Sequence, residues 1–247
     1  MSITINYKTR LTTKNSINRV FFVDEKFSIL SLKKHILSSE YSHISDLMKT
    51  KDTKKKILDF DFSSKKKLIL VSLHKNISSS EVENLGAKFF DLFKENKISH
   101  YEVVSDSVLI NQNISVSYFL HGLKLKSYKF EKYKTKKKKN SFNLIITGKN
   151  KPSLKNQVKF KAIEEGTFYT RDLVSEPGNV LHPDEYAKRL SLLKKDGLKI
   201  NIYDEKKLKK MGMNALLGVG QGSIRGSYLV TIEWNGARNN TNPLAFI

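Results

Sequence analysis

The chain has 247 residues, with 45 lysines and arginines against 24 acidic residues and a formal net charge of +21 at pH 7. This length allows one large domain or two small ones, and 39% hydrophobic residues are enough for a packed core. No apolar run approaches the roughly 20 residues of a membrane span. The complete absence of cysteine excludes disulfides, thiolate metal sites and a cysteine nucleophile. We therefore expect a soluble intracellular protein.

Lysine supplies nearly all of the positive charge, because arginine occurs at only six positions. Nucleic-acid-binding proteins favour arginine, whose planar guanidinium group matches phosphates and guanine edges. We therefore interpret the excess charge mainly as a compositional bias on solvated faces, although such a surface binds nucleic acid non-specifically at low salt. The lysine-rich runs at 54–56, 65–67 and 134–140 are each interpreted as solvated segments rather than as polyanion contacts.

Strands and helices are expected to alternate in the first half of the chain. Met1–Asn6 alternates like a strand instead of carrying a signal-peptide core, and Leu68–Leu73 is an apolar run that suits a strand buried on both faces. Residues 78–83 contain two serines, each followed three residues later by glutamate, which is the spacing of a helix-capping box. The predicted inner face of the helix that follows is Val82, Leu85, Phe89, Leu92 and Phe93.

A second helix and another strand continue this alternation. The apolar stripe of that helix is formed by Val116, Phe119, Leu120 and Leu123. Phe142–Thr147 is predicted to be a buried strand. Strands that alternate with amphipathic helices indicate an α/β layer structure.

A long connecting helix is predicted at residues 158–174, with Ile163, Phe168 and Leu173 facing inward. Pro183 then begins another helix, whose predicted apolar stripe is Tyr186, Leu190 and Leu193. A strand is expected at residues 198–203, followed by a short helix at 205–211 that Asp204 caps and Gly212 closes. Two final strands are predicted at residues 227–234 and 243–247.

The search for catalytic motifs assigns no catalytic, cofactor-binding or metal-binding residue. No two of the six histidines have the i, i+4 spacing of a helical metal site, and each is interpreted as a surface or half-buried residue. The adjacent carboxylates at 184–185 and 204–205 lie at predicted helix starts, where negative charge favours the helix dipole. The glycine-rich segment 218–223 is either an anion-binding loop or a flexible connector, and the connector is favoured.

The segment Arg171–Pro183 (R-D-L-V-S-E-P-G-N-V-L-H-P) closely resembles the start of the catalytic domain of the leucyl (cytosol) aminopeptidase family. It departs from the family pattern at Ser175, where asparagine is usual, and at His182, where threonine is usual. Leu208–Ser223 and Tyr228–Trp234 resemble later stretches of that domain, in the same order. Residues 128–134 resemble a segment of the family's amino-terminal domain.

The resemblance implies an α/β fold with three parts. These are an amino-terminal macro-like α/β domain at residues 1–152, a connecting helix at 153–176, and the incomplete start of the peptidase domain at 177–247. Members of the family are cytoplasmic, hexameric metalloproteases, hydrolases that release amino-terminal residues from peptides, leucine among them. They use two divalent ions, zinc or manganese, which activate a bridging water and polarise the scissile carbonyl.

The family's metal ligands lie in segments of the type G-K-G-x-x-F-D-[ST]-G-G and N-T-D-A-E-G-R, and neither occurs in this sequence. No catalytic or metal-binding role is therefore carried over to any residue. In the family, the strand that resembles Pro243–Ile247 runs directly into the G-K-G segment. The favoured hypothesis is a truncated part of an aminopeptidase that is inactive alone and binds no metal. The alternative is a non-catalytic binding module for DNA or an ADP-ribose-like ligand.

Overall fold

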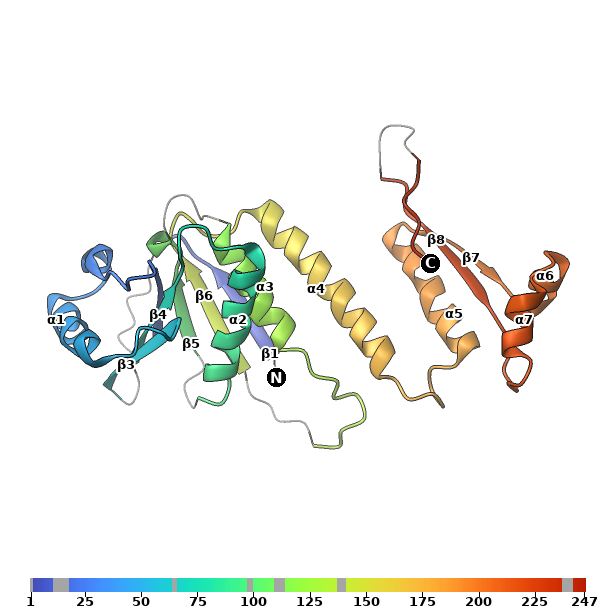
Figure 1. The fold of residues 1–247 in the computed structure, drawn as a ribbon, viewed down its shortest axis with the longest axis horizontal. Helices are drawn as coiled ribbons and strands as arrows, with labels where there is room; N and C mark the ends of the chain where they lie inside the picture. The colour runs from blue at the N-terminus through green and yellow to red at the C-terminus, as the bar shows by residue number, and fades with distance from the viewer. Residues whose placement is uncertain are drawn as a thin grey trace. The chain divides into compact units, whose positions relative to one another are not determined.

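A computed structural model describes residues 2–10, 18–63, 66–96, 100–108, 114–136, 141–236 and 242–247. The chain forms two compact units, Met1–Arg171 and Asp172–Ile247 (Figure 1). Both units combine helices and strands, which confirms the predicted α/β class. Within the described ranges, no helix is both long enough and apolar enough to cross a bilayer.

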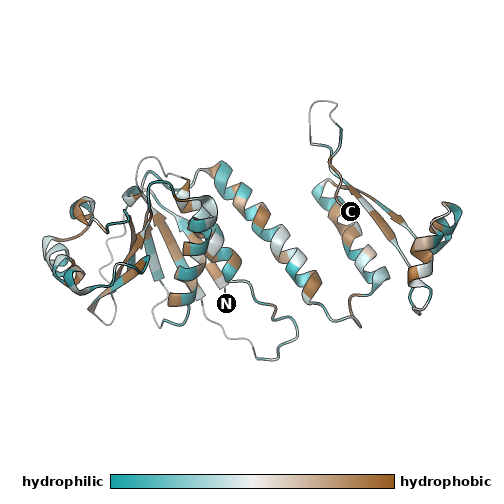
Figure 2. Cartoon of the chain, in the orientation of Figure 1, coloured by the Kyte–Doolittle hydropathy of each residue, from teal (hydrophilic) through white to brown (hydrophobic). Residues whose placement is uncertain are grey.

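The first unit is built on a six-stranded sheet with the strand order β1-β6-β5-β2-β4-β3. Every neighbouring pair is parallel except β3 and β4, and β1 and β3 form the two edges. The strands are β1 (Ser2–Tyr7), β2 (Asn18–Val23), β3 (Ile57–Ser63), β4 (Lys66–Ser72), β5 (His100–Val104) and β6 (Ser141–Thr147). Figure 2 shows hydrophobic residues concentrated in these strands, as expected for a sheet that is covered on both faces.

Helices cover both faces of this sheet. Helices α2 (Ser79–Phe93) and α3 (Ser115–Lys126) lie side by side on one face, as Figure 1 shows. The other face packs against α1 (Ser38–Leu47) and the short 3-10 helix η1 (Leu30–Lys34). Two further 3-10 turns, η2 (Met48–Thr50) and η3 (Ser105–Ser107), complete the unit.

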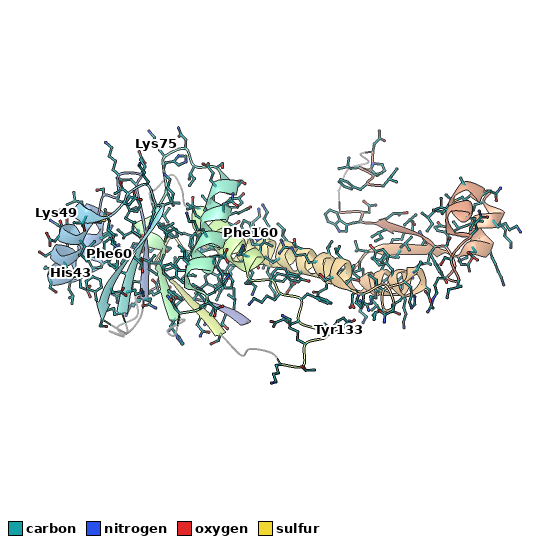
Figure 3. The ribbon with its side chains drawn as sticks, turned by 60° about the horizontal axis from the view of Figure 1, so that its bottom comes forward. His43, Lys49, Phe60, Lys75, Tyr133 and Phe160 are labelled. Atoms are coloured by element: carbon teal, nitrogen blue, oxygen red, sulfur yellow. The ribbon has the colours of Figure 1, made fainter. Side chains whose placement is uncertain are left out.

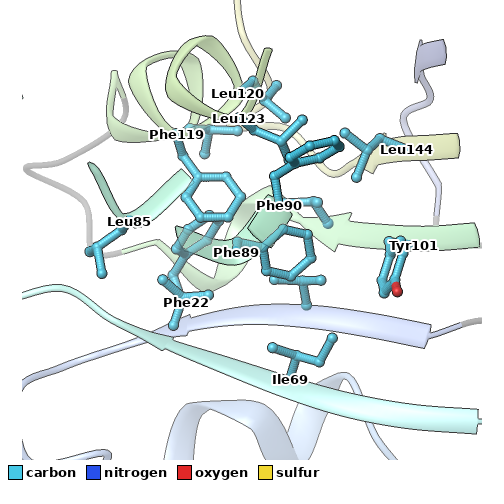
Figure 4. Close-up of a cluster of buried hydrophobic side chains, with 14 of the residues drawn as sticks. Phe22, Ile69, Leu85, Phe89, Phe90, Tyr101, Phe119, Leu120, Leu123 and Leu144 are labelled. Carbon is cyan, nitrogen blue, oxygen red and sulfur yellow. The ribbon is translucent and has the colours of Figure 1, made fainter. Parts of the chain in front are cut away.

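The larger core lies between α2, α3 and the sheet (Figure 4). The ring of Phe89 is 5.4 Å from that of Phe119 and 5.5 Å from that of Tyr101, measured between centroids. The predicted inner face of α2 is confirmed except at Leu92, which is 52% exposed, while Phe90 is buried in its place. The reason is that α2 packs against α3 as well as against the sheet, so the buried face of the helix includes Phe90 rather than Leu92.

The predicted capping box forms at the start of α2. The Ser78 hydroxyl accepts the backbone N–H of Glu81 at 3.3 Å, and the Glu81 carboxylate accepts the backbone N–H of Ser78 at 2.9 Å. The second candidate pair, Ser80 and Glu83, lies within the helix and does not cap it. Hydrogen bonds from the Ser78 backbone and hydroxyl lower the pKa of Glu81 from 4.5 to about 2.

Acid is expected to weaken the start of α2. Because the folded-state pKa of Glu81 lies below its unfolded value of 4.5, its contribution is complete above that pH and is lost as the pH falls toward about 2. Replacing Ser78 by alanine should raise the pKa of Glu81 toward 4.5, which an NMR titration of its carboxyl group would measure. An unchanged pKa in Ser78→Ala would contradict the capping account.

Helix α4 (Leu154–Ser175) begins four residues earlier than the sequence predicted. Its inward residues also differ, because Phe160 is buried whereas Ile163 is 43% exposed. Phe160 packs edge-on against the ring of Tyr118, with the centroids 5.2 Å apart. The contact of α4 with α3 therefore buries Phe160, about one helical turn before Ile163, the residue expected to face inward.

In its described residues, the second unit contains a two-stranded antiparallel sheet, three short α-helices and a 3-10 helix. Its elements are α5 (Pro183–Ser191), the 3-10 helix η5 (Leu192–Asp196), β7 (Lys199–Tyr203), α6 (Glu205–Lys210), α7 (Asn214–Gly220) and β8 (Leu229–Glu233). In α5, Ala187 is buried and Tyr186 is 44% exposed, so the predicted stripe was wrong at Tyr186.

The strand expected at residues 243–247 is also wrong. These residues have no regular secondary structure, and Phe246 is 90% exposed. Apolar alternation predicts a strand only where a neighbouring strand can pair with it, and β7 and β8 pair with each other.

Candidate functional site

The residues that resemble the peptidase motif have structural partners. Arg171 donates to the main-chain carbonyl of Leu125 at 2.7 Å and lies over the ring of Tyr128. Glu176, whose side chain is only 2% exposed, accepts a hydrogen bond from Arg189 at 2.9 Å. This buried ion pair joins the end of the motif to α5, so the motif positions helices rather than reacting groups.

The helix starts behave largely as the sequence predicted. Asp204 caps α6 by accepting the backbone N–H of Lys207 at 3.0 Å, and Gly212 ends the following turn with a φ of 74°. Asp184 lies in the first turn of α5, where it also contacts the imidazole of His182 and lies 3.4 Å from the guanidinium of Arg225. The carboxylates at 184 and 204 are therefore both occupied by local contacts.

The glycine-rich segment is part helix and part connector, because residues 221–223 lie in the turn that follows α7 and leads to β8. Residues 218–220 form the last turn of α7, and glycines with positive φ in the described chain are found instead at positions 148, 197 and 212. Because Gly218 and Gly220 lie within a helix, their backbone N–H groups do not form the concave nest that an anion-binding loop requires. The connector prediction is therefore wrong for residues 218–220 and confirmed for residues 221–223.

The lysine runs lie only partly in the described residues. Lys54–Lys56 are exposed, and so are Lys134 and Lys136. Lys65 and residues 137–140 lie outside the described residues. The described parts of the runs at 54–56 and 134–140 agree with solvated segments. The prediction was wrong for the run at 65–67, because Lys66 and Lys67 belong to β4, where their side chains are only 20% and 28% exposed and pair with acidic residues of α1 and β3.

Open parallel sheets bind ligands at the carboxyl ends of their strands, which in this chain include the ends of β5 and β6. The carboxylate of Asp106 accepts backbone N–H groups from Lys149 at 2.7 Å and Asn150 at 3.0 Å. The Ser105 hydroxyl donates to the main-chain carbonyl of Thr147 at 2.6 Å. These contacts close the two loops together, whereas the buried hydroxyl of Thr147 at the end of β6 has no hydrogen-bond partner among the described residues.

A cleft of about 560 Å³ lies between β1, α3 and α4 in the first unit, and we call it the β1 cleft. Its apolar lining includes Ile3, Ile5, Leu120, Val158, Phe160 and Phe168. Figure 3 labels Phe160, which lies on α4 where that helix meets the body of the first unit. A mostly apolar cleft with a few polar groups is the usual form of a ligand site.

The polar side of the β1 cleft is formed around a buried histidine. His121, expected to be exposed or half-buried, is only 6% exposed and bonds through Nδ1 to the carboxylate of Glu164 at 3.0 Å. Its ring also lies 4.9 Å from that of Phe160. Burial, together with the negative charge of Glu164, raises the pKa of Tyr7 in the same cleft. The pair holds a carboxylate in a fixed position inside the cleft.

One further polar group in the β1 cleft lacks a partner. The hydroxyl of Ser117 is buried and forms no hydrogen bond with the described residues. Sequence reasoning missed this group and the His121–Glu164 pair. The available signal was weak, because His121 simply adjoins the apolar stripe of α3 and Glu164 is 43 residues away.

Across the described residues, nowhere do three histidine, aspartate or glutamate side chains come together in a way that could hold a metal ion. His121 and Glu164 form a pair, and His182 with Asp184 forms another. The donor sets in this part of the chain thus do not fit a two-metal centre.

Comparison with known proteins gives a consistent result. The profile of the "cytosol aminopeptidase family, catalytic domain" matches residues 168–247. A probable cytosol aminopeptidase of Phytoplasma australiense is 41% identical over 166 residues, which cover 66% of this chain and 33% of the relative. That of Brucella ovis is 41% identical over 133 residues, or 51% of this chain and 27% of the relative. The chain thus spans about a third or less of these relatives.

Solved structures show the same fold at lower sequence identity. A mutant of tomato leucine aminopeptidase aligns with a TM-score of 0.72 at 19% identity, covering 94% of this chain and 50% of that one. The bottromycin maturation enzyme BotP in complex with Mn aligns with a TM-score of 0.66 at 14% identity, covering 89% and 45%. The fold and the sequence matches agree with the resemblance of the motifs. Residues 168–247 therefore belong to the catalytic domain of the cytosol aminopeptidase family.

Proposed function

We propose that this chain is part of a metal-dependent aminopeptidase that releases amino-terminal residues, including leucine, from peptides. The observation that carries the proposal is the match of residues 168–247 to the catalytic domain, supported by relatives of which the aligned segment covers a third or less. We further propose that the complete enzyme is a cytoplasmic hexamer. These properties are inferred from the family that the chain resembles.

Two zinc or manganese ions are proposed for the complete enzyme, where they would activate a water molecule for attack on the peptide carbonyl. The described residues do not fit such a centre, because no three suitable side chains converge. We therefore propose that the metal ligands lie in segments of the types G-K-G and N-T-D-A-E-G-R, which the 247 residues do not contain. The reading frame beyond the Ile247 codon is the place to look for them.

The 247-residue chain alone is expected to lack aminopeptidase activity. The test compares this chain with a chimera in which residues 1–247 are followed by the remaining residues of the Phytoplasma australiense relative. With manganese added, the chimera should hydrolyse a leucyl anilide and lose the activity on chelation, whereas the chain should match a mock purification. Manganese-stimulated hydrolysis by the chain, above that of the mock sample, would contradict the proposal.

The alternative function is that of a binding module, for which the exposed lysines are the supporting observation. Electrostatic binding of DNA by lysine should weaken by roughly a thousandfold between 50 and 200 mM salt, without sequence preference. Fluorescence anisotropy with two duplexes of unrelated sequence would measure this. Retention of one duplex at 200 mM salt would favour a dedicated DNA-binding role. A calorimetric titration with ADP-ribose tests the other ligand class, and a flat trace removes it.

A further inference from the structure

We propose that the β1 cleft binds a short apolar peptide, which pairs as an extra strand with the edge of β1 that faces away from β6. The site belongs to the first unit, whereas the catalytic-domain match begins at residue 168. The proposal therefore does not rest on the proposed aminopeptidase activity. Four features of the cleft support it.

The first feature is the direction of the backbone groups of β1. The backbone N–H of Lys8 donates to the carbonyl of Ile146 on β6 at 2.8 Å. In a parallel pair, successive residues turn their N–H and C=O groups alternately to one side and the other. The backbone N–H and C=O groups of the even-numbered residues of β1 therefore point toward β6. Those of Ile3, Ile5 and Tyr7 point to the outer edge of the sheet. The contact of the Lys124 ammonium with the Ile3 carbonyl, at 3.5 Å, agrees with this direction.

The second feature is the lining next to that edge. The side chains of Ile3 and Ile5 lie on the face of β1 that lines the cleft, together with Leu120 of α3. Val158 of α4 completes this lining although it is 69% exposed. An extended peptide that pairs with β1 would thus place alternate side chains in an apolar cleft, as in β-augmentation.

The third feature is charge of both signs at the cleft. Lys124 and Lys161 line it together with Glu164 and Glu165. The side chains of Lys161 and Glu165 lie 3.7 Å apart and are 74% and 69% exposed. An ion pair this exposed contributes little free energy, so either group can leave the other and pair with a charged ligand. A short peptide with free ends carries one ammonium and one carboxylate, for which the cleft offers counter-charges of both kinds.

The fourth feature is Ser117, a residue that lines the cleft and whose buried hydroxyl has no hydrogen-bond partner among the described residues. A buried hydroxyl without a partner is unfavourable, and a peptide N–H or C=O group would supply the missing bond. The cleft volume of about 560 Å³ lies within the range of small-ligand sites. These features select a peptide over a purely apolar ligand.

Calorimetry on the 247-residue chain with tri-leucine tests the proposal. We expect saturable binding of tri-leucine, and much weaker binding of tri-serine, of tri-leucine with N-methylated amides and of tri-leucine blocked at both ends. These three peptides remove apolar contact, strand pairing and charge in turn. Mass spectrometry of the recovered peptide keeps binding separate from hydrolysis. Absence of saturable binding, or equal binding of the N-methylated peptide, would overturn the proposal.

Two valines of α4 provide a matched pair of variants. Val158 lines the cleft, whereas Val174, which is 82% exposed, does not. Val158→Glu should weaken tri-leucine binding at least about tenfold, and Val174→Glu should leave it unchanged. Equal affinity in both variants would reject the β1 cleft as the site. If Val158→Glu failed to fold, the peptide series above would still decide the matter.

Discussion

Replacing Gly122 by alanine is expected to lower the free energy of unfolding of the first unit by about 3 kcal/mol or more. A Cβ atom at Gly122 of α3 would lie 1.9 Å from the carbonyl oxygen of Glu83 on α2. A Cβ at Gly86 of α2 would lie equally close to the carbonyl oxygen of Phe119 on α3. Real Cβ contacts are essentially never shorter than 3.0 Å, so the two helices must separate and the core between them must open.

Gly166 of α4 is the matched control, because nothing lies within 4 Å of a Cβ placed there. Gly166→Ala should stabilise the protein by up to about 1 kcal/mol, as is usual for an exposed helical glycine. Amide hydrogen exchange in β2 and β5 of the full chain would measure both variants. Equal exchange protection in Gly122→Ala and Gly166→Ala would show that α2 and α3 do not pack backbone to backbone.

Phe89→Ala is the second change with a large expected effect, a loss of about 4 kcal/mol in the free energy of unfolding of the first unit. Phe89 is fully buried, and its ring contacts those of four other aromatic residues: Phe93, Tyr101, Phe119 and Phe142. Truncation would leave a cavity that its neighbours, held by the sheet and by α3, cannot fill. The effect should appear as faster amide exchange throughout the first unit.

Leu92 is the control for this variant, since it lies on the same helix and is 52% exposed. Leu92→Ala removes an apolar side chain of similar size from a position where most of it already contacts water. Its effect should stay within about 0.5 kcal/mol. A loss for Leu92→Ala that approached that of Phe89→Ala would place Leu92 in the core and contradict the structure.

Elements whose signals are local could be predicted well. The apolar run of β4 and the alternation of β1 required no knowledge of distant residues, and both strands are confirmed. The same holds for the cap at Asp204, where the side chain and the backbone N–H that it accepts are three residues apart. Family membership was also readable from the linear motif at Arg171–Pro183, and the comparisons confirm it.

The candidate site could not be predicted, because its parts come from distant segments. Glu164 meets His121 only when α4 lies against α3, and neither residue has a distinctive sequence context. The backbone groups of Ile3 and Ile5 face away from β6 only because β1 is at the edge of the sheet, which depends on the strand order. A pattern read along the chain contains no information about which strand has a neighbour.

The sequence by itself determined the family, the α/β class and six elements of the first unit, namely β1, β4, β6, α2, α3 and α4, because hydrophobic periodicity and capping act over a few residues. Only the tertiary structure decided which side of each helix is buried, as Phe90, Ile163 and Tyr186 show. It also decided that residues 243–247 form no strand and that β1 borders an open cleft. The physical reason is that burial and strand pairing depend on the residues that lie nearby in space, and many of these residues are far away in the sequence.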